Sequence, residues 1–202
     1  MRVLTLASMV AIAAAQFSAM PTVAQTLISK QVQLGDFGTC LLKQAPVQSA
    51  KLLRTALGSA EENKQAGMLA RGHNVCVHGL VLTGKTGAIR GAVAQAALFQ
   101  DSALLDTLAA RPATTAMRPG RADGRQFLIA YATCLVGADP GKTASFLRTA
   151  YGTAEERAGF VAYGDTLKAC MPLGQEYQAD IPDLRNQIAA IAYQVADPSE
   201  AK

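Results

Sequence analysis

The chain has 202 residues with 19 lysines and arginines, 15 acidic residues and a formal net charge of +4, and its few aromatic residues (5%) include no tryptophan. The weak positive charge is spread along the chain, whereas nucleic-acid-binding proteins gather it in a basic stripe with aromatic side chains for base stacking. This composition argues against a nucleic-acid partner.

The first 24 residues predict an export signal. Arg2 supplies a positive charge, residues 3–15 are apolar and uncharged, and residues 22–24 favour cleavage before Gln25. The apolar stretch is shorter than the roughly 20 residues that span a bilayer as a helix. We therefore expect a periplasmic or secreted protein, with residues 1–24 removed and no transmembrane segment in the mature chain. An uncleaved membrane anchor is the alternative.

Beyond the signal, short blocks of sequence occur twice at a spacing of 94 residues. The paired blocks are Thr39-Cys40-Leu41 with Thr133-Cys134-Leu135, Leu53-Arg54-Thr55-Ala56 with Leu147-Arg148-Thr149-Ala150, and Gly58, Glu62 and Cys76 with Gly152, Glu156 and Cys170. Near the end of each copy the spacing becomes 95, where Ile89-Arg90 aligns with Leu184-Arg185. A spacing shared by several blocks indicates an internal repeat.

The repeat predicts an all-α fold of two tandem homologous four-helix units. Each unit has about 65 residues, near the lower limit for a self-sufficient core. We expect the units within residues 25–104 and 126–202, joined by a linker over residues 105–125 that is rich in proline, glycine and arginine. The arginines of this linker are expected to be solvated, with weak binding of an anion or a lipid headgroup as the alternative.

Apolar spacing and proline positions predict the first two helices of each unit. The apolar residues at helical spacing are Leu34, Phe37 and Leu41 in the first copy and Leu128, Tyr131 and Leu135 in the second. Pro46 and Pro140 each begin a second helix, the latter after Asp139 as a candidate N-cap. The residues that this second helix is expected to bury are Leu52, Leu53 and Ala56, and Phe146, Leu147 and Ala150.

A corner with the same cap signals follows the second helix in both copies. Gly58 and Gly152 lie where a helix C-cap favours positive φ. The candidate capping boxes are Ser59 with Glu62 and Thr153 with Glu156, in which the hydroxyl caps the next helix and the glutamate reaches back to the cap residue. One helix should therefore end and another begin at each corner.

The four cysteines predict two disulfides in an exported chain, with three possible pairings. If both units fold alike, each inherits its own bridge, which favours Cys40–Cys76 and Cys134–Cys170. The alternatives cross-link the two units. Each intra-unit bridge is expected to contribute about 4 kcal/mol to stability.

Two motifs match known sites without the context those sites need. Residues 79–86 satisfy the phosphate-loop pattern, but the second copy lacks it and the repeat leaves no room for a nucleotide-binding sheet, so we expect no nucleotide. His73, Cys76 and His78 suggest zinc, but a disulfide-bonded Cys76 has no thiolate to offer. Glu61 and Glu62 are neighbours on a helix and do not face one substrate atom. We expect no metal, no cofactor and no catalytic residue.

The loop after Cys76 differs most between the copies. Residues that both copies share are expected to build the fold, so an unshared site belongs in a loop of this kind. The residues of this possible binding loop are His73, His78, Lys85 and Arg90.

The pattern resembles a family of small exported bacterial proteins of unknown function. The residues that carry the resemblance are Cys-Leu-[Leu/Val], a following proline, Ala-x-x-Leu-Arg-Thr, Gly-[Ser/Thr]-Ala-Glu-Glu, a second cysteine and a last helix with Leu/Ile-Arg. The resemblance implies a signal peptide, tandem helical units and one cysteine pair in each, and it implies no activity.

These observations favour an exported, non-catalytic helical protein that acts as a binding module in the bacterial envelope. Its partner would be an unidentified protein or an envelope surface. A carrier of a small ligand or lipid is the alternative, and a small hydrolase using His73 or His78 is a third hypothesis.

Overall fold

The computed structural model describes residues 23–76, 86–120, 124–172 and 181–197, and within them the regular secondary structure is helical with no strand. The helices are α1 (Val23–Gln44), α2 (Pro46–Leu53), α3 (Ala60–Gly72), α4 (Thr86–Gln100), α5 (Ser102–Ala109), α6 (Gly124–Ala138), α7 (Pro140–Leu147), α8 (Ala154–Ala162), α9 (Gly164–Cys170) and α10 (Ile181–Ala196), with one 3₁₀ turn, η1 (Asn74–Cys76). The all-α prediction is confirmed for this part of the chain.

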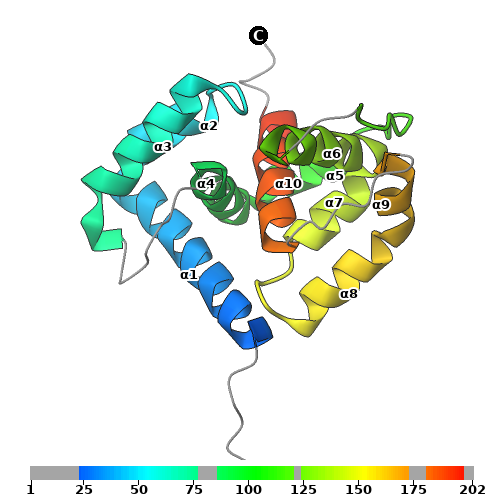
Figure 1. Cartoon of the computed structure of the whole chain (residues 1–202), viewed down its shortest axis with the longest axis horizontal. Coiled ribbons are helices and arrows are strands. Elements are labelled where there is room, and N and C mark those ends of the chain that lie inside the picture. The colour runs from blue at the N-terminus through cyan, green and yellow to red at the C-terminus, as the bar shows by residue number, and fades with distance from the viewer. Residues whose placement is uncertain (1–22, 77–85, 121–123, 173–180, 198–202) are drawn as a thin grey trace, which may run out of the picture.

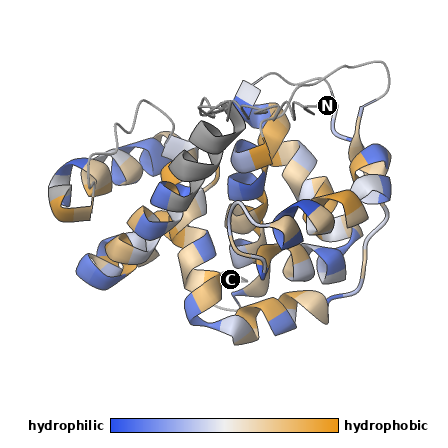
Figure 2. Cartoon of the chain, turned by 90° about the horizontal axis from the view of Figure 1, so that it is seen from below, coloured by the Kyte–Doolittle hydropathy of each residue, from blue (hydrophilic) through white to orange (hydrophobic). Residues whose placement is uncertain are grey.

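Helices α4 and α10 pack against each other in the middle of the molecule. Helices α1, α2 and α3 flank α4 on one side, and α6 to α9 flank α10 on the other (Figure 1). Buried side chains from both sides form one hydrophobic cluster. The outer helices carry hydrophilic residues on one side and hydrophobic residues on the other (Figure 2). The two halves of the chain therefore share a core.

Two glycines allow the central helices to come this close. A Cβ atom on Gly91 of α4 would lie 2.4 Å from Cβ and 2.5 Å from the carbonyl oxygen of Asn186 in α10. A Cβ atom on Gly38 of α1 would lie 2.3 Å from the carbonyl oxygen of Ala92 in α4. Because backbone atoms occupy that space, a larger residue at either position would push the helices apart.

The second helix of each copy begins at its proline and ends earlier than expected. Helices α2 and α7 end at Leu53 and Leu147, with Arg54 and Arg148 as C-caps. The predicted core residues within them are buried: Leu52, Leu53, Phe146 and Leu147. Ala56 and Ala150 lie beyond the helix ends and are exposed, so their predicted burial is wrong.

The corners after α2 and α7 have the same cap geometry. Gly58 and Gly152 have φ of 75° and 74° and lie in the turn beyond the C-cap, where left-handed backbone suits glycine. Ser59 is the N-cap of α3, with its hydroxyl oxygen 3.1 Å from the Glu62 backbone nitrogen. The Glu62 carboxylate accepts from the Gly58 N–H at 2.6 Å, not from the cap residue, because the Ser59 N–H bonds to the Ala56 carbonyl.

The second copy has the same capping arrangement but differs from the first in its number of helices. Thr153 caps α8 and accepts from the Glu156 N–H at 3.1 Å, while Glu156 accepts from the Gly152 N–H at 2.6 Å. The stretch that corresponds to α3 is divided into α8 and α9 at Tyr163. The Tyr163 side chain is fully buried and donates to the Leu135 carbonyl at 2.9 Å, which fixes this break against α6.

The segment expected to be a linker is partly helical. Helix α5 covers residues 102–109, begins at an Asp101 N-cap, buries Leu105 and Leu108, and packs against α7. Farther on, the Thr114 N–H donates to the Gly137 carbonyl at 2.8 Å and Arg118 Nε donates to the Ala169 carbonyl at 3.1 Å. Described residues between α5 and α6 are therefore attached to the second half of the molecule.

The two disulfides join Cys40 to Cys76 and Cys134 to Cys170, the pairing that the duplication favours. Each closes a sequence separation of 36 residues. Disulfides of this kind are typical of proteins in oxidising compartments such as the periplasm or the extracellular space. No described helix combines the length and the apolar character needed to cross a membrane.

Candidate functional site

Residues of the possible binding loop fall in different surroundings. His78 and Lys85, like the phosphate-loop match at residues 79–86 apart from Thr86, lie outside the described residues. His73 is the C-cap of α3 and partly exposed, and its carbonyl accepts the Cys76 N–H at 2.9 Å. Within the described part of the chain, no three His, Cys, Asp or Glu side chains are grouped closely enough to hold a metal ion.

Arg90 is not available to a ligand. Its side chain is 0% exposed, and its guanidinium donates to the Thr55 carbonyl and hydroxyl at 2.7 Å each and to the Leu53 carbonyl at 2.5 Å. These carbonyls belong to the turn that ends α2, whose backbone acceptors need a donor. The expectation that Arg90 contributes to a surface site is corrected to a structural role.

Arg185 has the equivalent structural role in the second half of the chain. It is also 0% exposed, and it donates to the Thr149 carbonyl at 2.6 Å and to the Glu156 carboxylate at 2.6 Å. Its guanidinium carbon lies 5.0 Å from the ring centroid of Phe146 and 4.3 Å from that of Tyr151. A buried arginine paired with a carboxylate and with backbone carbonyls holds its surroundings in one geometry.

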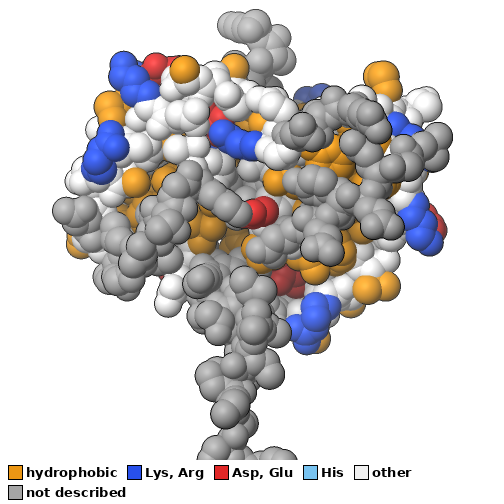
Figure 3. Space-filling view, viewed as in Figure 1, with side chains coloured by type: hydrophobic (Ala, Val, Ile, Leu, Met, Phe, Trp, Pro, Cys, Tyr) orange, Lys and Arg blue, Asp and Glu red, His pale blue; other side chains and the backbone are white. Residues whose placement is uncertain are grey.

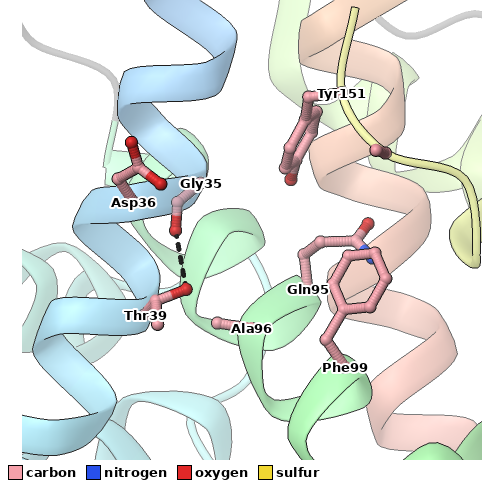
Figure 4. Close-up of a pocket in the computed structure, with 8 residues that line it drawn as sticks. Gly35, Asp36, Thr39, Gln95, Ala96, Phe99 and Tyr151 are labelled. Atoms are coloured by element: carbon pink, nitrogen blue, oxygen red, sulfur yellow. Dashed lines mark hydrogen bonds between the residues drawn. The ribbon is translucent and has the colours of Figure 1, made fainter. Parts of the chain in front are cut away.

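The Tyr151 side chain, held by Arg185, borders a surface groove of about 250 Å³. The groove, here called the Tyr151 groove, is lined by Gly35, Asp36, Thr39, Gln95, Ala96, Phe99, Ala150 and Tyr151. Figure 4 shows Asp36 and Thr39 on α1 opposite Tyr151 and Phe99, with Ala96 of α4 between them. The groove therefore lies where the first half of the chain meets the turn after α7.

The polar atoms of the groove are few. The Gln95 side chain is buried, and both polar atoms of its amide are already hydrogen-bonded. Nε2 donates to the Leu147 carbonyl at 2.9 Å, and Oε1 accepts from Arg185 at 3.4 Å. The Thr39 hydroxyl donates to the Gly35 carbonyl at 3.1 Å. Asp36 is exposed, is the one charged side chain among the lining residues, and forms no ion pair with the described chain.

Tyr151 is the unusual member of the lining. Its hydroxyl oxygen is buried, and the Arg185 side chain lies beside the ring. Burial raises the pKa of Tyr151 to about 12, against the opposing effect of the positive charge on Arg185. The phenol is therefore neutral at physiological pH.

Two lining residues are small where the other copy has isoleucine, whereas Tyr151 is larger than its counterpart Leu57. At spacings of 94 and 95, Gly35, Ala96 and Tyr151 of the groove correspond to Ile129, Ile191 and Leu57. Ile191 is buried and Leu57 packs against the core. Ile129 packs against the turn that contains Leu57 and Gly58, since a Cβ atom on Gly58 would lie 3.3 Å from Ile129 Cδ1. At the groove the Tyr151 ring takes this space instead, because a Cβ atom on Gly35 would lie 2.8 Å from Tyr151 Cε2.

Sequence reasoning missed this groove and searched only the loop after Cys76. No pattern in the helices marks it: of the eight lining residues only Thr39 and Ala150 recur, as Thr133 and Ala56, but most other helical positions also differ between the copies.

The other exposed side chains of the described surface are scattered. Lysine and arginine side chains lie at separate places on the face that Figure 3 shows. The large exposed hydrophobic side chains, other than Phe99 of the groove, are spread over different elements: Val47, Met68, Val75, Met117, Val161 and Ile181.

Comparison with known proteins found no matching family model, no matching curated protein and no matching solved structure.

Proposed function

We propose that this chain is an exported, non-catalytic helical protein that binds a partner polypeptide through the Tyr151 groove. The observation that carries the proposal is the groove itself, a surface hollow of about 250 Å³ where α1 and α4 meet the turn after α7. Its lining combines the small residues Gly35, Ala96 and Ala150 with the rings of Phe99 and Tyr151.

The scaffold in this proposal is a tandem repeat whose two units dock through α4 and α10. The signal at residues 1–24 directs it to the bacterial envelope, where the disulfides Cys40–Cys76 and Cys134–Cys170 are stable. The buried arginines support a non-catalytic role, because Arg90 and Arg185 bind helix-end carbonyls and leave no charge directed at a substrate.

The groove volume favours a polypeptide partner over a carried ligand. Pockets for drug-sized ligands hold about 300–1,000 Å³, and an engineered cavity of about 150 Å³ holds benzene. A groove of about 250 Å³ lies between the two and suits one large side chain. An anchor side chain seated in a pocket is the usual centre of a protein interface. A lipid carrier would need a larger hollow.

Selection of random peptides displayed on phage against the exported, disulfide-bonded protein tests this proposal. The decisive variant is Ala150→Trp, which fills the groove from an exposed position without entering the core. Ala56→Trp is the matched control, because Ala56 is the exposed counterpart in the other turn. Enriched peptides should bind the wild type and the Ala56→Trp variant and lose at least tenfold in affinity on Ala150→Trp. Failure to enrich any peptide, or equal binding to both variants, would contradict the proposal.

A further inference from the structure

We infer that the Tyr151 groove selects a long cationic anchor, a lysine or arginine side chain of the partner polypeptide. This inference rests on the proposed function and names the chemistry of its site. Its basis is the charge of the lining: Asp36 is the one ionisable group with a charge at neutral pH among the eight residues, and no described cation neutralises it.

The walls of the groove suit the stem of such a side chain. The lining includes the small apolar residues Gly35, Ala96 and Ala150 and the ring of Phe99, which is 47% exposed. Lysine and arginine bury their methylene stems along apolar surface and keep the charged end near water. Asp36 lies at the α1 side of the groove, where such an end can meet its carboxylate (Figure 4).

The two aromatic residues add to this preference. A cation near the face of an aromatic ring is attracted by the ring quadrupole. One side of the Tyr151 ring is already taken by Arg185, whose charge is balanced by Glu156 at 2.6 Å. Phe99 has no such partner among the described residues and its ring is open to solvent.

The anionic and neutral alternatives fit less well. A carboxylate or phosphate would meet the Asp36 charge, while the nearest cation, Arg185, is buried and fully engaged. A phenylalanine or leucine anchor would cover the apolar part of the groove and leave the Asp36 carboxylate without a partner. Polar groups left unpaired in an interface reduce affinity.

Binding of three model compounds to the exported, disulfide-bonded protein distinguishes these anchors. The probes are Nα-acetyl-lysine methylamide, its neutral isostere Nα-acetyl-norleucine methylamide and Nα-acetyl-phenylalanine methylamide, titrated while backbone amide chemical shifts are followed by NMR. The lysine compound should shift the amides of Gly35, Ala96 and Ala150 and bind about two- to fivefold more tightly than the norleucine compound, the size expected of one exposed ion pair.

Asp36→Asn should remove the difference between lysine and norleucine, and Asp165→Asn, an exposed acid of α9 outside the groove, should leave it unchanged. If the norleucine or phenylalanine compound binds as tightly as the lysine compound, the cationic anchor is wrong and the groove remains a binding site. If no compound shifts the groove amides, both the cationic anchor and the proposed function are contradicted.

Discussion

Arg185 connects the fold to the candidate site at the scale of single residues. Its guanidinium holds the Thr149 carbonyl and the Glu156 carboxylate, and it stacks on the Tyr151 ring that borders the groove. Removing one member of a buried ion pair leaves the other charge without compensation. The stability of this corner and the position of Tyr151 therefore depend on one side chain.

Arg185→Met should lower the free energy of unfolding by about 3–5 kcal/mol, because Glu156 would keep its charge in a buried site without its arginine. Arg148→Met is the control: its partner Asp106 is exposed, so the loss should be at most about 1 kcal/mol. Urea unfolding followed by circular dichroism measures both. Equal losses for the two variants would contradict the structural role of Arg185.

The buried tyrosines predict the behaviour at alkaline pH. Burial raises the pKa of Tyr131 and of Tyr151 to about 12 each from the usual 10.0, and it raises the pKa of Tyr163 as well. Because the folded state disfavours the phenolate, stability is complete below about pH 10 and falls as the pH rises toward 12.

In an ultraviolet titration of the folded protein, three of the five tyrosines should therefore stay protonated at pH 11. All five should titrate near pH 10 in concentrated urea. Tyr151→Phe should remove one of the three tyrosines that are still protonated at pH 11. Titration of every tyrosine near pH 10 in the folded state would show that these side chains are exposed.

At the scale of helices, close packing of α4 against α1 and α10 depends on glycine. Gly91→Ala should destabilise the protein by about 1–3 kcal/mol, because the added methyl group meets the Asn186 backbone and α10 must shift. Gly72→Ala is the matched control at the end of α3, where a Cβ atom would have nothing within 4 Å. It should be neutral or slightly stabilising. A neutral Gly91→Ala in thermal unfolding would contradict this packing.

The helices were predictable where their signals are local. Pro46, Pro140, Asp139 and the Ser59 cap act on the backbone within a few residues, so their patterns predicted the helix starts that the structure shows. Helix α5 lies partly within the expected linker, whose prolines and glycines follow it, whereas Asp101 caps the helix and Leu105 and Leu108 give it a buried side. Its burial depends on α7, a tertiary contact that no local pattern contains.

The candidate site was not predictable for the same reason. Gly35 and Tyr151 are far apart in sequence, and their contact exists only after the two halves have docked. Arg90 looked like a surface residue because arginine is rarely buried. Its burial follows from the carbonyls of Leu53 and Thr55, which face it across the fold.

At the scale of the whole molecule, the shared core between α4 and α10 predicts that the two halves unfold together. Replacing either cysteine pair by serine should lower the free energy of unfolding of the entire chain by about 4 kcal/mol, because each bridge closes a separation of 36 residues. The chain should still unfold in one cooperative transition, at a lower temperature. Differential scanning calorimetry of the two double variants tests this. Two resolved transitions, of which only one moves, would show that the halves are independent domains.

Site-specific photo-cross-linking in the native host tests the Tyr151 groove most directly. The chain offers a matched pair: Thr39 lines the groove, and Thr133 is its exposed counterpart on α6, with the same hydroxyl bond to the carbonyl four residues earlier. A benzoylphenylalanine at position 39 should give a discrete cross-linked polypeptide, which Ala150→Trp abolishes, and position 133 should give none. The same cross-link from both positions, or a product at 39 that survives Ala150→Trp, would contradict the account.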